Sequence, residues 1–174
     1  MVTAKGIGLT RWVLILLLLY SVHGAGAQTS SAKFERSYFY TAFTSQDTNA
    51  INQQLDIIKN DGPKGREAFE GALRMKKAGL LKGPFNKLKE FKAGREKLED
   101  MITAQPHNAE FRFLRLMVQE QAPKILGYNN ELEEDHKYLI DHFSTMPQAA
   151  QKAIVNYSKA SKVLSPSDFN LEKE

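Results

Sequence analysis

Two arginines, Arg112 and Arg115, stand three residues apart within the apolar segment 111–117. Residues at this spacing share one face of a helix. Paired guanidinium groups can hold a carboxylate of a ligand or partner through bidentate hydrogen bonds. The alternative is pairing within the fold, with Glu110, Glu120 or the acidic residues near position 133. We favour internal pairing, because arginine stems readily cover apolar surface.

A stretch of basic side chains precedes these arginines. Residues 64–97 hold 11 Lys or Arg against 4 Glu, whereas residues 99–174 hold 12 acidic against 8 basic side chains. A basic surface suits an acidic partner, anionic lipid or polysaccharide. A solvated helix face, or pairing with residues 131–135, explains the same pattern, and we favour these. The candidate partner-binding residues are Arg74, Lys77, Lys92, Arg95, Arg112, Arg115, and the apolar anchors Phe113 and Tyr128.

The sequence lacks the combinations that are typical of catalysis and metal binding. It has no cysteine, which excludes thiolate zinc sites and cysteine nucleophiles. Glu133-x-x-His136 has the spacing of a di-iron motif, but that site needs a second copy and the sequence has none. We therefore expect no enzymatic activity, no cofactor and no metal. An enzyme is the alternative if Tyr40, Tyr128, His136 and Arg112 converge in one pocket.

Residues 1–27 have the pattern of a secretory signal peptide. Lys5 and Arg11 form a basic start, residues 13–20 are continuously apolar, and residues 25–27 are small, as cleavage before Gln28 requires. The apolar run is shorter than the ~20 residues that span a bilayer. We expect a periplasmic or secreted protein with no membrane span after cleavage and no nucleic-acid partner. An uncleaved anchor is the alternative.

Cleavage would leave a single domain of ordinary size. The formal net charge would fall from +4 to +2, because two basic residues and no acidic ones leave with residues 1–27. Without cysteine there are no disulfides, so stability must come from apolar burial between helices.

Apolar residues follow a helical period over residues 34–164. We expect an all-α domain of about seven helices in antiparallel hairpins, because the connectors are short. A flexible lead-in at 28–33 and a frayed tail at 165–174 flank it. The aromatic residues 37–40 also suit a strand. The expected helices cover about 34–42, 45–60, 65–78, 84–104, 108 to 123 or 127, 130–143 and 147–161, with a loop at 79–83 before the fourth.

Individual residues predict where several helices begin. Ser45 is expected to cap the second helix and Asn108 the fifth. Pro84 fits the first turn of the fourth helix. Asn130 and Glu133 have the spacing of a capping pair for the sixth.

Residues 91–114 resemble the junction between two tetratricopeptide repeats. Gly94-x3-Leu98-x2-Met101 matches the alternation of small and large residues in a repeat's second helix, and residues 106–110 resemble the connector into the next repeat. Small residues there let paired helices approach closely. The resemblance implies a right-handed stack of helical hairpins with a concave surface that receives a peptide or a partner helix.

The segments 71–79, 91–95, 111–115 and 122–128 are also similar to a group of uncharacterised exported helical proteins of Gram-negative bacteria. This similarity implies a periplasmic helical domain and brings no assigned activity. Together with the missing catalytic motifs, it predicts a non-enzymatic interaction or scaffold module that binds another envelope protein or peptide. The alternative is an envelope-surface binder of anionic lipid or polysaccharide through residues 64–97.

Overall fold

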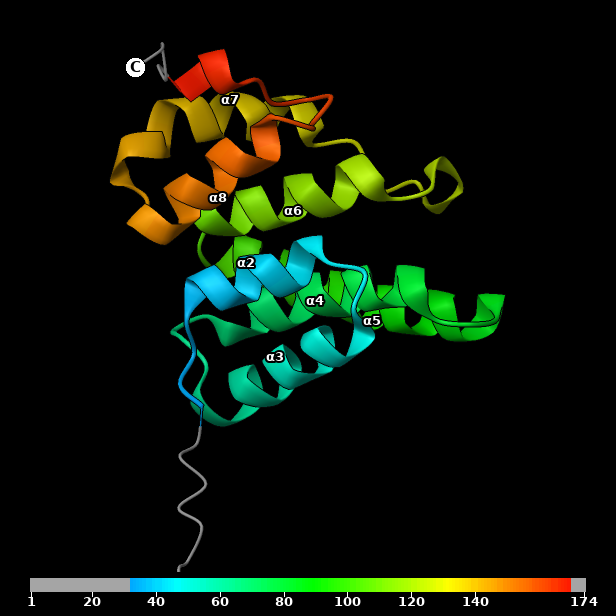
Figure 1. Cartoon of the computed structure of the whole chain (residues 1–174). Coiled ribbons are helices and arrows are strands. Elements are labelled where there is room, and N and C mark those ends of the chain that lie inside the picture. Colours follow the sequence, from blue (N-terminus) through cyan, green and yellow to red (C-terminus); the bar gives the residue numbers. More distant parts are fainter. Residues whose placement is uncertain (1–31, 170–174) are drawn as a thin grey trace, which may run out of the picture. The chain divides into compact units, whose positions relative to one another are not determined.

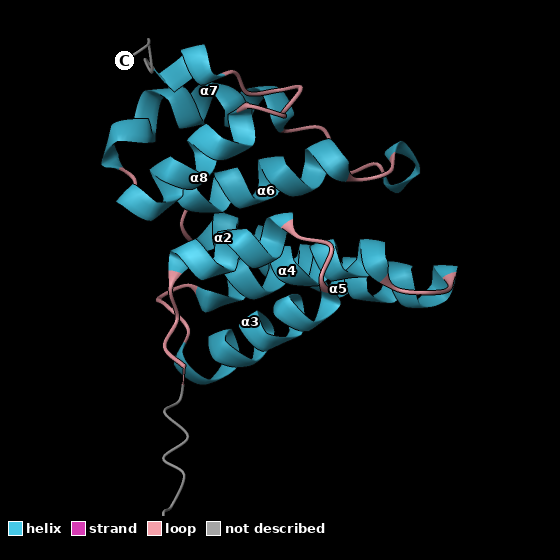
Figure 2. Ribbon diagram, in the orientation of Figure 1, coloured by secondary structure: helices cyan, strands magenta, loops and turns pink. Residues whose placement is uncertain are grey.

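The computed structural model describes residues 32–169 of the chain (Figure 1). This part contains seven α-helices and three short 3₁₀ helices, and no strand occurs in it (Figure 2). The expected all-α class is confirmed, and residues 37–40 are helical rather than extended. The predicted signal peptide, residues 28–31 of the lead-in and residues 170–174 of the tail lie outside the described residues.

The helices are joined by short connectors, as the sequence predicts. The α-helices are α2 Arg36–Thr44, α3 Thr48–Asp61, α4 Arg66–Leu80, α5 Pro84–Ala104, α6 Ala109–Gln121, α7 Leu132–His142 and α8 Gln148–Ser158. The 3₁₀ helices are η1 Lys124–Leu126, η2 Phe143–Thr145 and η3 Pro166–Phe169. Helix α4 packs on α3, α5 and α6, while α2 contacts both α3 and α8.

Two of the predicted helix starts are confirmed. Pro84 is the first residue of α5, where its missing N–H costs no hydrogen bond. Asn108 caps α6, because its side-chain oxygen accepts hydrogen bonds from the backbone N–H groups of Glu110 at 3.1 Å and Phe111 at 3.3 Å.

Two other predicted caps are wrong. Asp47, not Ser45, caps α3 by accepting a hydrogen bond of 2.8 Å from the N–H of Asn49. The Ser45 hydroxyl instead donates to the carbonyl of Ala42 at the end of α2. Helix α7 begins after Glu131 without any side-chain cap, so the expected pair of Asn130 and Glu133 does not form.

The first residues of the expected frayed tail are packed against the domain. The Phe169 ring is 6% exposed and its centroid lies 4.7 Å from that of Phe143. Asp168 accepts a hydrogen bond from the N–H of Ser165 at 2.7 Å and lies 3.0 Å from Nε2 of His136. The short η3 helix therefore belongs to the domain, and burial of one aromatic ring holds it there.

Aromatic side chains from three helices form the centre of the core. Phe39 of α2, Phe69 of α4 and Phe111 of α6 are buried. The rings of Phe39 and Phe69 meet edge to face at 5.1 Å, and those of Phe69 and Phe111 do so at 6.0 Å. Edge-to-face pairs of this kind add to the stabilisation from burial alone. They tie α2 to α4 and α6.

Helices α4 and α5 lie side by side as an antiparallel hairpin (Figure 1). They approach closely at two glycines. A Cβ on Gly71 would lie 2.5 Å from the carbonyl oxygen of Gly94, and a Cβ on Gly94 would lie 2.5 Å from that of Gly71. The expectation that Gly94 allows close helix packing is therefore confirmed. At the far end of α4, Gly79 is helical, so the expected loop at 79–83 shortens to residues 81–83.

We expect opposite effects from alanine at two glycines of α4. Gly71→Ala should destabilise the protein by about 1–3 kcal/mol, because the methyl group forces α4 and α5 apart. Gly79→Ala meets no atom within 4 Å and should stabilise the helix by roughly 0.5 kcal/mol. Urea denaturation followed by circular dichroism measures both. Equal effects of the two substitutions would contradict the close α4–α5 contact.

Candidate functional site

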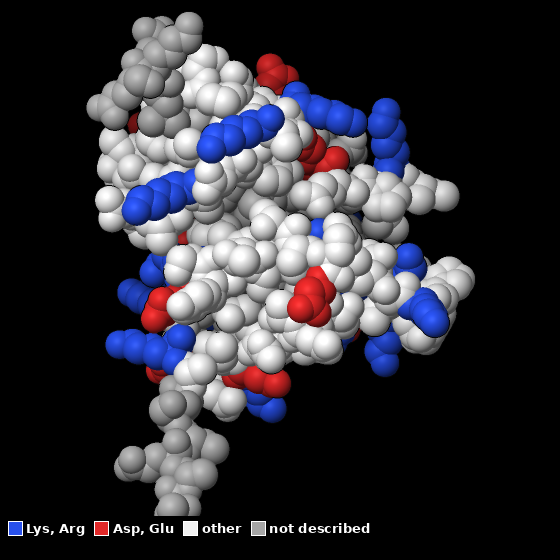
Figure 3. Space-filling view, in the orientation of Figure 1, with Lys and Arg blue, Asp and Glu red and all other residues white. Residues whose placement is uncertain are grey.

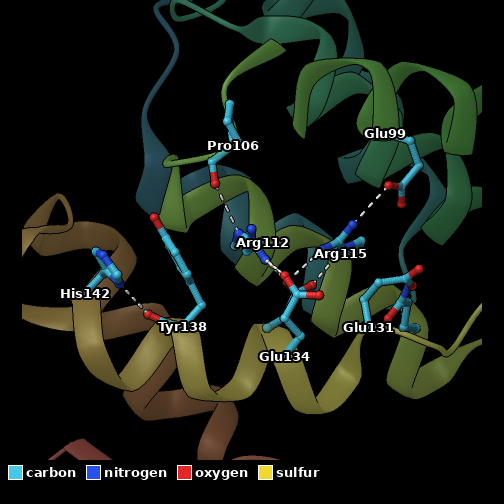
Figure 4. A network of polar contacts seen from close by, with 10 residues as sticks. Glu99, Pro106, Arg112, Arg115, Glu131, Glu134, Tyr138 and His142 are labelled. Carbon is cyan, nitrogen blue, oxygen red and sulfur yellow. Dashed lines mark hydrogen bonds and ion pairs between the residues drawn. The ribbon is translucent and has the colours of Figure 1, made fainter. Parts of the chain in front are cut away.

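Arg115 is buried in an internal ion pair. Its Nε and Nη2 atoms each donate to a different oxygen of Asp135 at 2.7 Å, and its Nη1 donates to Glu99 at 3.1 Å (Figure 4). The side chain is only 7% exposed. Burial by itself lowers the pKa of the guanidinium, but the hydrogen bonds and charge of Asp135, with those of Glu99, outweigh it and raise the pKa. Arg115 therefore stays charged.

Arg112 belongs to the same network. Its Nη1 donates to Glu134 at 2.8 Å and to Asp135 at 3.0 Å, and its Nε donates to the carbonyl of Pro106 at 3.2 Å (Figure 4). The guanidinium also lies over the Tyr138 ring, 4.3 Å from its centroid. The preferred interpretation of internal pairing is confirmed for both arginines, with the acidic residues near position 133 as partners.

Asp135 is the residue of this network that the sequence did not single out. It lies in the first turn of α7 and is 0% exposed. A buried carboxylate is stable only when it is paired and hydrogen-bonded, and Asp135 receives three hydrogen bonds from the two arginines. The unusual placement of two arginines in an apolar segment was the signal that such a partner must exist.

Tyr128 connects this network to the segment that follows η1. Its hydroxyl donates to Glu99 at 2.5 Å, and its ring packs edge to face on Phe91 at 5.7 Å. The Arg95 guanidinium lies 4.7 Å from the same ring. Burial, followed by the charge of Glu99, raises the pKa of Tyr128. Tyr128 therefore fastens the chain to α5.

The two expected apolar anchors are both in the core. Tyr128 is 2% exposed and Phe113 is 0% exposed. The Phe113 ring lies 5.7 Å from the ring of Tyr40 and 5.9 Å from that of Tyr157. Neither side chain is accessible to a partner in this structure, because helix packing uses both.

The remaining candidate residues of α4 and α5 divide into paired and unpaired cations. Arg74 pairs with Glu70 at 2.9 Å and with Glu90 at 3.6 Å. Lys77 and Lys92 form no ion pair with any residue of the described range 32–169. The alternative in which residues 131–135 pair with the lysines of α5 is wrong for the described side chains. Glu131, Glu134 and Asp135 bond to residues of α6, and Glu133 forms no ion pair within the described range.

The four residues whose convergence would favour an enzyme fall into three separate groups. Arg112 and Tyr128 belong to the network around Asp135 and Glu99. The Tyr40 hydroxyl donates to Glu110, which Arg36 also binds. His136 contacts Asp168. Within residues 32–169, no group of three or more His, Asp or Glu side chains is placed to hold a metal ion.

The structure places an apolar groove where the sequence indicated only a loop between helices. It has a volume of about 520 Å³ and lies between the end of α4, the start of α5 and the segment from the end of α6 through η1. Its walls include Met75, Ala78, Gly79, Leu88, Phe91, Met117, Val118, Ile125 and Leu126. A volume of this size is typical of ligand-binding pockets.

Leu88 and Ile125 line the groove and are also exposed to solvent, and the exposed Phe85 directly follows the lining residue Pro84 in the chain. Phe85 is 76% exposed, Leu88 41% and Ile125 93%. The tip of the α4–α5 hairpin and η1 project on the same side of the domain (Figure 1). Clustered exposed apolar residues of this kind mark interaction surfaces. We call the groove with these three residues the tip groove.

Two lysines line the tip groove, and four more lie nearby in the sequence. Lys76 and Lys87 line it, and burial lowers the pKa of Lys76. Lys87 donates to the carbonyl of Gly79 at 3.2 Å. Figure 3 shows blue side chains around this edge of the domain. The lysines of residues 75–92 are Lys76, Lys77, Lys82, Lys87, Lys89 and Lys92, against the single acidic residue Glu90.

None of these six lysines forms an ion pair within the described part of the chain. The single acid among them, Glu90, lies 3.6 Å from Arg74. One pattern in the sequence indicates this site: Leu80, Phe85 and Leu88 alternate with lysines around a turn. What it lacked was the position of η1, which forms the opposite wall.

Comparisons with known proteins add no family assignment. No protein-family model matches the sequence, and comparison with curated proteins and with solved structures gave no significant match. In the described part of the chain, no helix combines the length and the hydropathy needed to cross a membrane.

Asp135→Ala should destabilise the protein by about 3–5 kcal/mol, because it leaves the buried Arg115 without its partner. The control is Glu134→Ala, which removes a carboxylate that is 67% exposed and should cost less than about 1 kcal/mol. Combining Asp135→Leu with Arg115→Met should recover much of the loss. Urea denaturation measures all three, and similar losses for the two single variants would contradict the role of Asp135.

Stability should fall as the pH rises above about 10, the ordinary pKa of tyrosine. Burial raises the pKa of Tyr40, Tyr128 and Tyr157 in the folded state, so the folded protein retains protons that the unfolded chain loses. Phenolate absorbance and circular dichroism should therefore change together. Tyr128→Phe should reduce the part of the absorbance change that accompanies the loss of helix. Ionisation of all tyrosines with the helices intact would contradict the burial.

Proposed function

We propose that this chain is a non-enzymatic, exported protein-interaction or scaffold module, and that the tip groove is its binding surface. The observation that supports the proposal most directly is the apolar groove of about 520 Å³ with Lys76 and Lys87 in its lining. Apolar burial supplies affinity at interfaces, while charges at the rim supply orientation and specificity. The partner in this proposal is another envelope protein or peptide.

The apolar part of the surface supports a macromolecular partner. Phe85 and Ile125 are largely exposed although they are among the most apolar residue types. Each would gain roughly 1.5–3 kcal/mol on complete burial. These residues lie on different elements, the start of α5 and η1, and Ile125 lines the groove while Phe85 directly follows the lining residue Pro84. A partner that extends from the groove along the start of α5 would cover both.

The basic, apolar and small-residue pattern of residues 1–27 supports export with cleavage before Gln28. A tetratricopeptide-like right-handed stack is the proposed arrangement of the helices. The close α4–α5 packing at Gly71 and Gly94 supports it, whereas the contact between α2 and α8 departs from an open repeat array, in which each unit touches only its neighbours.

A second candidate function is binding to an anionic envelope surface, either lipid or polysaccharide. The observation that favours it is the position of Phe85 and Ile125 on the projecting elements, with lysines beside them. Apolar side chains that insert at the interface, together with nearby lysines, are how peripheral proteins hold anionic membranes. Such binding would weaken strongly between low and physiological salt.

Site-specific photo-crosslinking in cells tests the proposed function. A photoreactive residue at Leu88 should yield one protein adduct, whereas the same residue at Ile140 should not. The two positions are matched in exposure, at 41% and 38%, and Ile140 lies on α7. The adduct should disappear when Lys76→Glu and Lys87→Glu are combined. Equal adducts at both positions, or lipid adducts alone at Leu88, would contradict a protein-interaction role.

A further inference from the structure

Resting on the proposed function, we propose that the tip groove binds an amphipathic helix of a partner protein, with acidic residues flanking the apolar face of that helix. The walls of the groove, one glycine and the distribution of charge support this class of ligand.

The walls of the tip groove are themselves helices. The last turns of α4 supply Met75 and Ala78, the first turns of α5 supply Leu88, and the last turns of α6 supply Met117 and Val118. The groove is open to solvent, whereas residues deeper in the domain are covered by further helices. Ridges of side chains on helices pack into one another, so a groove between helices fits another helix.

Gly79 gives the incoming helix room to approach. It lines the groove, and a Cβ placed on it would meet no atom within 4 Å. Its helical backbone has no need of glycine, so any residue with good helix propensity is compatible with this position. Glycine instead leaves open space at the wall, where a partner's side chain can pack.

The charge argues for several carboxylates rather than one. Six lysines occur within residues 75–92, on both sides of the turn between α4 and α5. A fatty acid carries a single carboxylate and would leave Phe85 and Ile125, which lie on separate elements, largely uncovered. An acidic helix can present carboxylates at successive turns, about 5.4 Å apart, and can cover both apolar residues.

Lys76 provides a favourable position for one of these carboxylates. Burial lowers its pKa and it has no acidic partner among the described residues. A carboxylate beside a desolvated ammonium group stabilises the charged form and forms a strong hydrogen bond. Binding should therefore depend on Lys76 and Lys87 more than on lysines elsewhere.

The test begins with a random peptide library displayed on phage and selected on protein purified from cells that express the full chain. Peptides retained by the wild type but not by Gly79→Leu should share apolar residues at i, i+3, i+4 and i+7 with Asp or Glu beside them. Thr103→Leu is the matched control, because Thr103 is exposed near the end of α5 and does not line the groove. It should select the same peptides as the wild type.

A synthetic peptide from this selection then gives the affinity by fluorescence anisotropy. Gly79→Leu should weaken binding at least about tenfold. The combined Lys76→Glu and Lys87→Glu variant should do the same, whereas Lys152→Glu with Lys159→Glu, an equal charge change on and after α8, should not. Both control lysines are exposed. Unchanged affinity in the two groove variants would overturn the inference.

Two further outcomes would also overturn it. One is a selection that yields no peptides dependent on Gly79, or peptides without acidic residues. The other is a phage selection that yields no peptide, together with sedimentation of the protein with phosphatidylglycerol vesicles. Phe85→Ser and Ile125→Ser would abolish that sedimentation. If the photo-crosslinking at Leu88 still captures a protein in these cases, the proposed function stands and only the acidic helix is wrong.

Discussion

The buried pairing of Arg115 with Asp135 is the interaction on which the packing of α7 and the groove depend. Asp135 on α7 bonds to two arginines of α6, and Arg115 continues the network to Glu99 of α5. Glu99 in turn accepts the hydroxyl of Tyr128, which follows η1. Because η1 forms one wall of the tip groove, this network of charged and hydrogen-bonded residues holds the groove in place. No residue of the network lines the groove itself.

A buried network of this kind favours specificity of packing more than stability. Removing two charges from water is expensive, and close pairing only offsets that cost. Neither Arg115 nor Asp135 can move without leaving a buried charged group of the other without its hydrogen bonds. Helix α7 is thereby held in one register on α6, whereas apolar contacts such as those of Leu139 would tolerate small shifts.

Most of the helices could be predicted from the sequence because their signals are local. Pro84 and Asn108 act within one turn of their own helices, and the helical period of apolar residues needs no tertiary information. The predicted caps at Ser45 and Asn130 are wrong because other residues nearby can occupy the same position at the start of a helix. Asp47 lies only two residues after Ser45 and competes for the same helix start, so neighbouring candidates decide the outcome.

The candidate site was harder to predict, because it depends on distant segments. Arg112 and Arg115 suggested either a carboxylate of a ligand or an acidic residue of the fold as partner. Only the fold brings Asp135 to them, from 23 and 20 residues away. Phe113 and Tyr128 have the residue types of interface anchors, yet burial assigns them to the core. The lysines of residues 75–92 were recognised as basic, but the apolar groove among them requires η1, whose position no local pattern specifies.

The contact between α2 and α8 has a consequence for how such a domain can change in length. Phe113 of α6 packs on Tyr40 from the first described helix and on Tyr157 from α8. In an open solenoid, units can be added or lost at either end, since each touches only its neighbours. Here the two ends share one aromatic centre, so duplication of a hairpin would have to break it. Variation among descendants of this chain should therefore accumulate in the connectors and at the projecting tips, while the number of helices stays constant.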